Sequence, residues 1–317
     1  MNLFLSCLTQ PAPSANYRGE SEQNRAIIQK ITIGEQEYPV ISPEAIRNAL
    51  REMLQNYGLP CNRSREHNEE QLAVSFQDYP NAEEFIDDFY FGYMVANRKE
   101  IKNPPDDYQY KRDSVLRNNL AVGLSPYRYE TLFTQSPKTV APGGGKEAPK
   151  WKNAGSSQLL HREMTFTAYQ FPVALNLKDC RVSPNDAGSK HNQWFGSLMR
   201  AFSELNGVAG NHARSYFEMS PVSVIARMTG RLASGFPLYP YSADGAEPEV
   251  VEDILQGDLP GAEFVLGGDI VKALSDERRS ALEDKGVSLF RTAEKAFEHI
   301  CLQATGEKLP ELETVPW

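Results

Sequence analysis

Two arginines one helical turn apart are the residues whose types and spacing point most directly to chemistry. Arg47 and Arg51 lie in the segment YPVISPEAIRNALREML (residues 38–54), which predicts a short strand followed by a helix. Side chains four residues apart are neighbours on a helix, where like charges repel mildly. Glu44 is within reach of Arg47, but no acid lies three or four residues from Arg51. A bound anion such as a phosphate chain would supply that partner, and a solvated helix edge is the alternative interpretation.

The helix that carries the arginines has a clear expected start. Ser42 is a preferred N-cap, Pro43 suits the first helical position, and Glu44 places negative charge near the positive end of the helix dipole. Apolar side chains then recur at the spacing of one buried helical face, at Ile46, Ala49, Leu50, Met53 and Leu54. The two arginines are therefore expected on the flank of a core helix.

The composition is that of an ordinary globular protein. The chain has 317 residues, of which 40% are hydrophobic and 24% charged, enough for one large domain or two. No segment approaches the length of a membrane span, and we expect a cytoplasmic protein without membrane association. The cysteines are scattered without metal-ligand spacing, so we expect reduced thiols, no metal and no cofactor; they are Cys7, Cys61, Cys180 and Cys301.

Charge is distributed unevenly along the chain despite a net charge of −9. Residues 98–162 contain twelve Lys or Arg against six Asp or Glu, whereas residues 242–317 contain seven against seventeen. Aromatic side chains are interleaved with Arg117, Lys150 and Lys152 in the basic block, a mixture that favours nucleic-acid binding. A solvated loop with ordinary aromatic packing is the alternative. The acidic end is either a subunit contact or a solubilising surface.

Other polar candidates lie around the predicted strands. Tyr17, Arg18 and Asn24 belong to an expected polar loop after the first strand, and Lys30 lies on the hairpin that precedes the helix. His161 and Arg162 begin the strongest strand pattern, next to a stretch rich in glycine and lysine at 136–157 that includes Lys138. That stretch is not a phosphate-binding loop of the Walker type, because Glu147 follows Lys146 where the motif requires Ser or Thr.

The order of elements predicts an α+β fold. In the first part of the chain we expect a strand at 2–9, a loop at 11–22, a hairpin at 26–41, the helix from Ser42, a helix at 82–96, and at 114–124 a strand whose spacing also fits a helix. A strand follows at 159–177, which Pro172 bends, places at an edge or divides into a hairpin. We then expect a helix at 192–205, a strand at 213–228, and alternating helices and strands from 247 that include a helix at 270–282. This order corresponds to the split β-α-β arrangement of ferredoxin-like and RRM-like folds, an antiparallel sheet with helices on one face and long insertions.

Several segments together resemble a known family. They are NLFLSCLTQPAPSANYRGESEQN (2–24), YPVISPEAIRNALRE (38–52), LLHREMTFTAYQFPVALNL (159–177) and NHARSYFEMSPVSVIARMTG (211–230). The chain is similar to the backbone subunit of type I CRISPR Cascade, in the DevR-like branch typical of the I-B subtype. The resemblance spans both ends of the expected core.

The resemblance implies one RRM-like subunit over 1–317, with palm, fingers and thumb. The palm would be 1–60 and 159–230 and the fingers 61–135. Position and composition make 136–158 the candidate thumb and 231–317 an acidic C-terminal lobe. Such subunits bind guide RNA through its backbone, assemble head to tail into a filament, contact other Cascade subunits, and support pairing with target DNA without catalysis. The RNP1 pattern is absent, so we do not expect base stacking on a bare sheet face.

Carried over by position, the resemblance assigns guide contacts to specific residues. Its strand-to-helix arginine motif falls on Ser42, Arg47 and Arg51. The loop after the first strand matches at Tyr17, Arg18 and Asn24, and the loop before the last core strand at Asn211, His212 and Arg214. We also expect RNA contacts at Lys30, Arg117, Lys138, Lys150, Lys152, His161 and Arg162.

Two other functions are compatible with the sequence. Backbone subunits of type III effectors cut target RNA with an aspartate between the first strand and the first helix, but no Asp precedes Asp78 here. A stand-alone RNA-binding regulator would share the basic and aromatic block. A filament subunit differs in needing two unlike surfaces, which the charge asymmetry would provide.

Overall fold

The core of the molecule is a ferredoxin-like β-α-β-β-α-β unit. The computed structural model describes residues 1–22, 25–67, 72–96, 108–135, 159–208 and 217–311. The core elements are β1 (Asn2–Thr9), α1 (Pro43–Asn56), the short strands β11 (Arg117–Asn118) and β12 (Ala121–Gly123), β15 (Tyr169–Asn176), α3 (Lys190–Ser203) and β16 (Pro221–Thr229). The strand order β16-β1-β15-β12 and the antiparallel pairing of neighbours confirm the expected fold class.

Further strands extend this sheet at both edges. A hairpin forms as β5 (Lys30–Ile33) and β6 (Gln36–Ile41), and β6 pairs with β12. It is shorter than the hairpin predicted at 26–41, because residues 26–28 belong to a strand of another sheet. At the other edge β17 (Phe264–Gly268) pairs with β16, and β18 (Ser288–Phe290) runs parallel to β17. The C-terminal segment is therefore continuous with the palm sheet.

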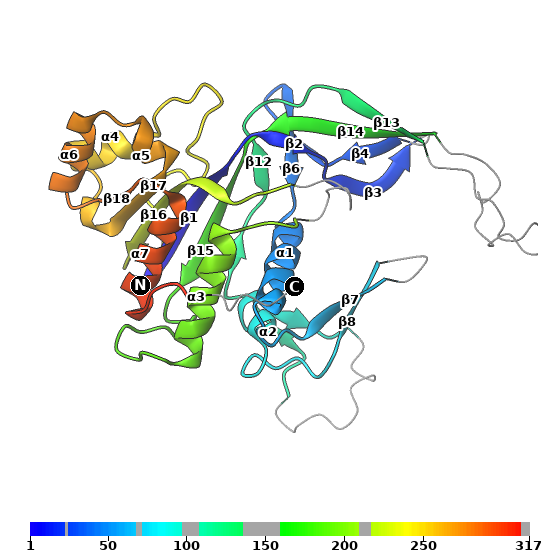
Figure 1. Cartoon of the computed structure of the whole chain (residues 1–317), viewed down its shortest axis with the longest axis horizontal. Helices are drawn as coiled ribbons and strands as arrows, with labels where there is room; N and C mark the ends of the chain where they lie inside the picture. The colour runs from blue at the N-terminus through cyan, green and yellow to red at the C-terminus, as the bar shows by residue number, and fades with distance from the viewer. Residues whose placement is uncertain (23–24, 68–71, 97–107, 136–158, 209–216, 312–317) are drawn as a thin grey trace, which may run out of the picture.

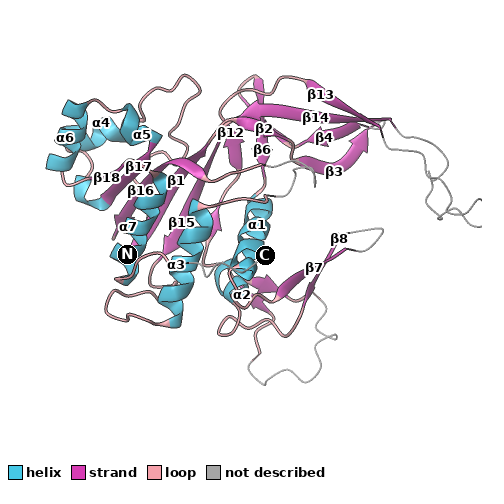
Figure 2. Cartoon of the chain, viewed as in Figure 1, coloured by secondary structure: helices cyan, strands magenta, loops and turns pink. Residues whose placement is uncertain are grey.

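Helices cover both faces of the sheet (Figure 2), so the expectation of helices on one face only is wrong. Leu3, Leu5 and Cys7 of β1 join the core under α1, α3 and α7 (Ala293–Thr305), whereas Phe4 faces a second core. Strand alternation explains the division, because successive side chains point to opposite faces. The second core is closed by α4 (Glu249–Gln256), α5 (Asp269–Ala273) and α6 (Asp276–Asp284). The continuous helix expected at 270–282 is wrong, because Ser275 caps α6 and starts a new helix.

A second, five-stranded sheet extends away from the palm (Figure 1). It consists of β2 (Ala12–Ser14), β3 (Tyr17–Glu22), β4 (Arg25–Ile28), β13 (Glu130–Gln135) and β14 (Leu159–Thr167). The loop expected at 11–22 is therefore wrong, since β2 pairs with the distant β14 and β3 forms a local hairpin with β4. The thumb candidate 136–158 connects β13 to β14 and lies outside the described residues.

The expected fingers contain two small hairpins and a short helix. The elements are β7 (Arg63–His67), β8 (Leu72–Phe76), α2 (Ile86–Phe91), β9 (Tyr93–Met94) and β10 (Lys111–Arg112). The helix expected at 82–96 is much shorter because Gly92 ends it with a φ of +67°. A Cβ at Gly92 would lie 2.4 Å from the Arg112 carbonyl oxygen, so glycine allows β10 to approach β9.

Pro172 does not bend or divide the long strand. The break between β14 and β15 falls at Ala168, and Pro172 lies inside β15 opposite Ser6 of β1. On the other side of β15, β11 pairs at positions 173–174 and β12 at positions 169–170. Pro172 therefore lies opposite the gap between these strands, where its missing N–H interrupts no ladder.

The strand expected at 213–228 begins at Pro221 in the described residues and ends at Thr229. Pro221 is thus its first residue and not an interruption, which is a position proline tolerates. Among the residues that the structure describes, no helix is long and apolar enough to span a membrane.

Candidate nucleic-acid interface

The N-terminus of α1 forms as the sequence predicts. The Ser42 hydroxyl accepts a hydrogen bond from the Ala45 backbone N–H at 3.2 Å, and Pro43 occupies the first turn. Ser42 therefore has a structural task, satisfying a backbone donor that the helix leaves unpaired. Its expected RNA contact stays a prediction.

Arg47 lies on the flank of α1 and is held against β11. Its Nε donates to Asn118 Oδ1 at 2.8 Å and an Nη to the Leu116 carbonyl at 3.4 Å. Partial burial lowers the pKa of Arg47, and nearby Arg117 and Arg63 lower it further against the opposing effect of Glu44. Arg47 thus lies in surroundings where nearby positive charge partly opposes the effect of Glu44.

Arg51 does not lack a partner, contrary to the sequence-based expectation. Its side chain is only 7% exposed, and its Nε donates to Asp87 of α2 at 3.1 Å. A second nitrogen donates to Asn48 Oδ1 at 2.8 Å, and the guanidinium lies over the Phe91 ring. Burial and repulsion from Arg63 lower the pKa of Arg51 to about 10, while Asp87 opposes that shift. The argument that Arg51 needs a bound phosphate is therefore wrong, because a protein carboxylate fills that role.

Asp87 and Asp88 attach the fingers to α1. Asp87 accepts hydrogen bonds from the backbone N–H groups of Asn62 and Arg63 at 2.7 and 3.1 Å, besides the bond from Arg51. Asp88 accepts from the Asn62 side chain at 2.9 Å and from the Asn81 N–H at 3.0 Å. Burial raises the pKa of Asp88 to about 6. We name this group of buried polar side chains the α1–α2 junction.

Lys30 is also engaged within the protein. Its ammonium lies 3.4 Å from Glu37 and 3.8 Å from the buried Glu163, and 4.1 Å from the centre of the Tyr127 ring. This pairing compensates the lysine charge at the base of the second sheet. An RNA contact by Lys30 would have to compete with two carboxylates.

His161 and Arg162 lie on β14, as expected from the strand pattern. His161 is exposed and lies edge-on to the ring of exposed Phe133, with 5.6 Å between ring centres. Arg162 is half-buried opposite Leu132 of β13. These two residues lie close together on the second sheet, away from the α1–α2 junction.

Arg117 is exposed on β11, next to Asn118. Because side chains alternate along a strand, Asn118 faces α1 and Arg117 faces the opposite side of the sheet. Tyr17 and Arg18 belong to β3 instead of a loop. The other predicted contacts lie outside the described residues: Asn24, Lys138, Lys150, Lys152, Asn211, His212 and Arg214.

The described residues of the basic and aromatic block do not form one surface. Tyr108 packs against Tyr110 with ring centres 5.0 Å apart, Tyr127 lies beneath Lys30, and Tyr129 and Phe133 are exposed near the second sheet. The contacts of Tyr108, Tyr110 and Tyr127 are ordinary packing, and nucleic-acid binding by the exposed rings stays a prediction.

Sequence reasoning missed Arg63 and Asn118. Asn118 holds the Arg47 side chain through a hydrogen bond, and the charge of Arg63 lowers the pKa of Arg47. Arg63 donates to the Gly92 carbonyl at 3.2 Å and lies over the Phe76 ring. Both residues lie in polar stretches with no local pattern that would mark them. Only the packing of α1 against β11 and β7 brings them to Arg47.

The described residues contain no group of three or more His, Cys, Asp or Glu side chains placed to hold a metal ion. All four cysteines are free and buried, and burial raises the pKa of each thiol above its ordinary value.

Comparison with known proteins places the chain in a family. No protein-family model matches it. It is 33% identical over 294 residues to the CRISPR-associated protein Cas7/Cst2/DevR of Myxococcus xanthus (strain DK1622), covering 89% of this chain and 91% of that protein. A chain of a pre-nicking CRISPR RNA-guided surveillance complex matches its fold with a TM-score of 0.60 at 11% identity, covering 96% of this chain and all of the other. A chain of another such complex gives 0.55 at 14% identity, covering 96% and 99%. The protein belongs to the Cas7/Cst2/DevR family of CRISPR-associated proteins.

Proposed function

We propose that this protein is a non-catalytic backbone subunit of a type I CRISPR Cascade surveillance complex in the cytoplasm. Copies assemble head to tail along the guide RNA, bind its phosphate backbone, support its pairing with the target DNA strand, and contact other Cascade subunits. Family membership and the likeness of fold to chains of surveillance complexes support this proposal.

The arginine cluster on the α1 flank is the observation that carries the RNA-binding part of the proposal. Arg47 is only half-buried, and its acceptors in the protein are a neutral amide and a carbonyl. Among the described residues no carboxylate forms an ion pair with Arg47, and Arg63 adds to the local positive potential. Phosphate groups are the natural partners of such a cluster.

The closed sheet face favours backbone recognition over base stacking. The segment after β16 crosses the face opposite α1, where the Gln170 amide exchanges hydrogen bonds with the Tyr241 backbone at 3.0 Å. The Ser6 hydroxyl donates to the Leu238 carbonyl at 3.0 Å on the same face. Bases cannot stack where the chain itself covers the strands, so sequence specificity would come from pairing with the guide.

Substitution of Arg47 tests the proposed RNA track. We expect Arg47→Ala to weaken binding to RNA of any sequence and to reduce the salt dependence of binding by about 0.7, the value for one phosphate contact on a single strand. Fluorescence anisotropy over a salt series measures both quantities. Arg291→Ala is the matched control, since Arg291 is an exposed arginine in the acidic C-terminal lobe. Equal salt slopes for Arg47→Ala and the wild type would contradict the α1 track.

Assembly on RNA tests the filament. The protein with guide RNAs of increasing length should give complexes whose mass rises in steps, measured by light scattering. One bound copy at every RNA length would contradict a backbone role and favour a stand-alone RNA-binding regulator.

Target cleavage tests the alternative of a type III subunit. Assembled complex is incubated with labelled RNA complementary to the guide and with Mg²⁺. We expect intact RNA, and cuts at regular intervals would replace our proposal with a nuclease function.

A further inference from the structure

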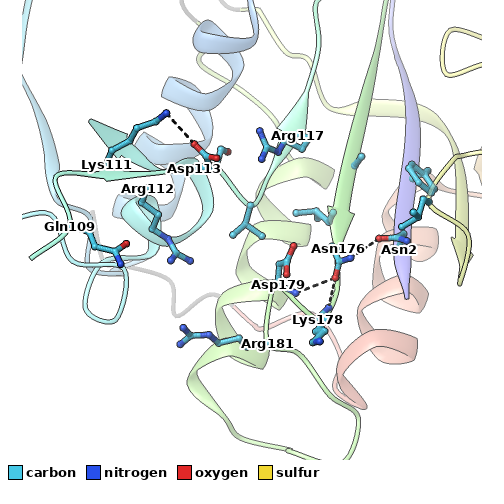
Figure 3. A pocket seen from close by; sticks show the side chains of 16 residues that line it. Asn2, Gln109, Lys111, Arg112, Asp113, Arg117, Asn176, Lys178, Asp179 and Arg181 are labelled. Atoms are coloured by element: carbon cyan, nitrogen blue, oxygen red, sulfur yellow. Dashed lines mark hydrogen bonds and ion pairs between the residues drawn. The ribbon is translucent and has the colours of Figure 1, made fainter. Parts of the chain in front are cut away.

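A polar cavity of about 800 Å³ lies on the face of the sheet opposite α1 (Figure 3). One wall is the fingers segment 109–115, another is the end of β15 with the turn that follows it, and the floor includes Phe4 and Ala174. Leu232, which is 90% exposed, lies at the rim. The cavity therefore opens between palm and fingers, on the other side of the sheet from Arg47.

The lining is strongly basic. Five cationic side chains face two acids, Asp113 and Asp179; the cations are Lys111, Arg112, Arg117, Lys178 and Arg181. Lys111 lies 3.8 Å from Asp113, and Arg181 lies 2.7 Å from Glu83. In the part of the chain that the structure describes, the other three cations have no carboxylate within salt-bridge distance. Like charges gathered without partners call for an anion.

Arg112 gives the strongest sign of a missing ligand. Its Nε is buried and has no hydrogen-bond partner among the described residues, while its guanidinium lies over the Phe89 ring. An unsatisfied buried donor on a charged group costs free energy that a bound acceptor would recover. The close approach of β10 to Gly92 fixes the backbone of Arg112 at this wall.

Arg181 shows that the opposite wall is also held in an unusual geometry. Its φ of +56° is the single positive value at a residue other than glycine in the described chain. Such backbone is uncommon for residues with a Cβ and is concentrated at functional sites. The turn directs Arg181 to the cavity edge, across from Arg112 (Figure 3).

We infer that this cavity binds a phosphate group of a nucleic-acid strand, as a second backbone contact separate from the α1 flank. The identification of the strand as nucleic acid rests on the proposed function, whereas the anion chemistry rests on the cavity alone. Among the described residues the lining contains one aromatic side chain, Phe4, which is buried in the sheet and offers no platform for a base. The ligand is recognised through its phosphates.

Cysteine footprinting locates binding in this cavity. All four natural cysteines are buried, so Leu232→Cys introduces an accessible thiol at the rim. The full-length variant is alkylated with and without a short oligouridylate, too short to bridge two copies. Leu302→Cys on α7, where Leu302 is 43% exposed, is the control thiol. We expect slower alkylation at position 232 and an unchanged rate at position 302. An unchanged rate at position 232 would overturn the inference.

Charge removal shows which side chains hold the strand. Arg117 and Lys178 are exposed and unpaired among the described residues, so Arg117→Gln with Lys178→Gln leaves the fold intact. We expect this pair to abolish the protection at position 232 and to reduce the salt slope for the oligonucleotide by about 1.4. Lys285→Gln with Arg291→Gln is the matched control in the acidic C-terminal lobe and should change neither the protection at position 232 nor the salt slope. Protection that persists in the cavity pair would overturn the inference.

Two further arms separate this site from the α1 track and from base recognition. Protection at position 232 should persist in Arg47→Ala, and its loss there would overturn a separate site. If Arg47→Ala leaves RNA affinity unchanged while the cavity pair loses protection, the α1 track fails and the cavity stands. Tripolyphosphate should slow alkylation at position 232 and uridine should not; the reverse result would overturn phosphate recognition.

Discussion

The α1–α2 junction and the basic cavity both contain arginines in partly closed surroundings, but their charges are balanced differently. In the junction, Arg51 is paired with Asp87, and Asp87 in turn accepts two backbone N–H groups. In the cavity, Arg112 has a buried donor without a partner among the described residues. A buried cation with its own carboxylate holds elements together, whereas a cation without one is available to a ligand.

The largest effect on stability is expected when the carboxylate of Asp87 is removed from the junction. Asp87→Ala leaves Arg51 buried without its counter-ion and two backbone N–H groups without an acceptor. We expect a loss of about 3–5 kcal/mol in the free energy of unfolding, measured by urea denaturation. Asp113→Asn removes an exposed cavity acid and should change stability by less than about 0.5 kcal/mol. Similar small losses for both variants would show that the junction does not hold the fingers.

Asp88, next to Asp87 in the junction, is expected to destabilise the folded protein when it is ionised, whereas Asp87 stabilises it. The pKa of Asp88 is raised from 3.8 to about 6, so the folded state holds its proton more tightly than the unfolded state. Stability therefore falls as the pH rises from about 4 to about 6 and is level above that range. Asp88→Asn removes the buried charge and keeps an acceptor for Asn62 and Asn81.

We expect Asp88→Asn to raise the free energy of unfolding by about 1 kcal/mol at pH 7 and to flatten its dependence between pH 4 and 6. Urea denaturation at several pH values measures both effects. Destabilisation at pH 7 together with an unchanged pH profile would show that Asp88 is an ionised partner in the junction, like Asp87.

The smallest effect on stability is expected in the cavity. Arg117→Gln with Lys178→Gln removes two exposed cations that have no carboxylate partner in the described ranges, so stability should change by less than about 0.5 kcal/mol. The same pair should lose oligonucleotide binding at the cavity. A large loss of stability would show that Arg117 and Lys178 stabilise the fold, as the junction residues do, and would contradict the difference between the two regions.

Local patterns predicted the elements that depend on local interactions. The start of α1 at Ser42 and the strand Asn2–Thr9 formed as expected, and the hairpin before α1 formed over 30–41. Patterns failed where long-range pairing decides. Residues 12–14 lie in a stretch of turn-forming composition, yet they form a strand because β14, about 150 residues later, offers them a partner.

The candidate site shows the same division between sequence and tertiary structure. The sequence alone determined that Arg47 and Arg51 lie one turn apart on the same helix, because helix geometry is local. It could not show that Asp87, thirty-six residues later, neutralises only Arg51. The packing of the fingers against the palm produces this pairing. The same packing brings Arg112, Arg117 and Lys178 together around one cavity. Electrostatic pairing depends on distance in space, and only the tertiary structure determines that distance.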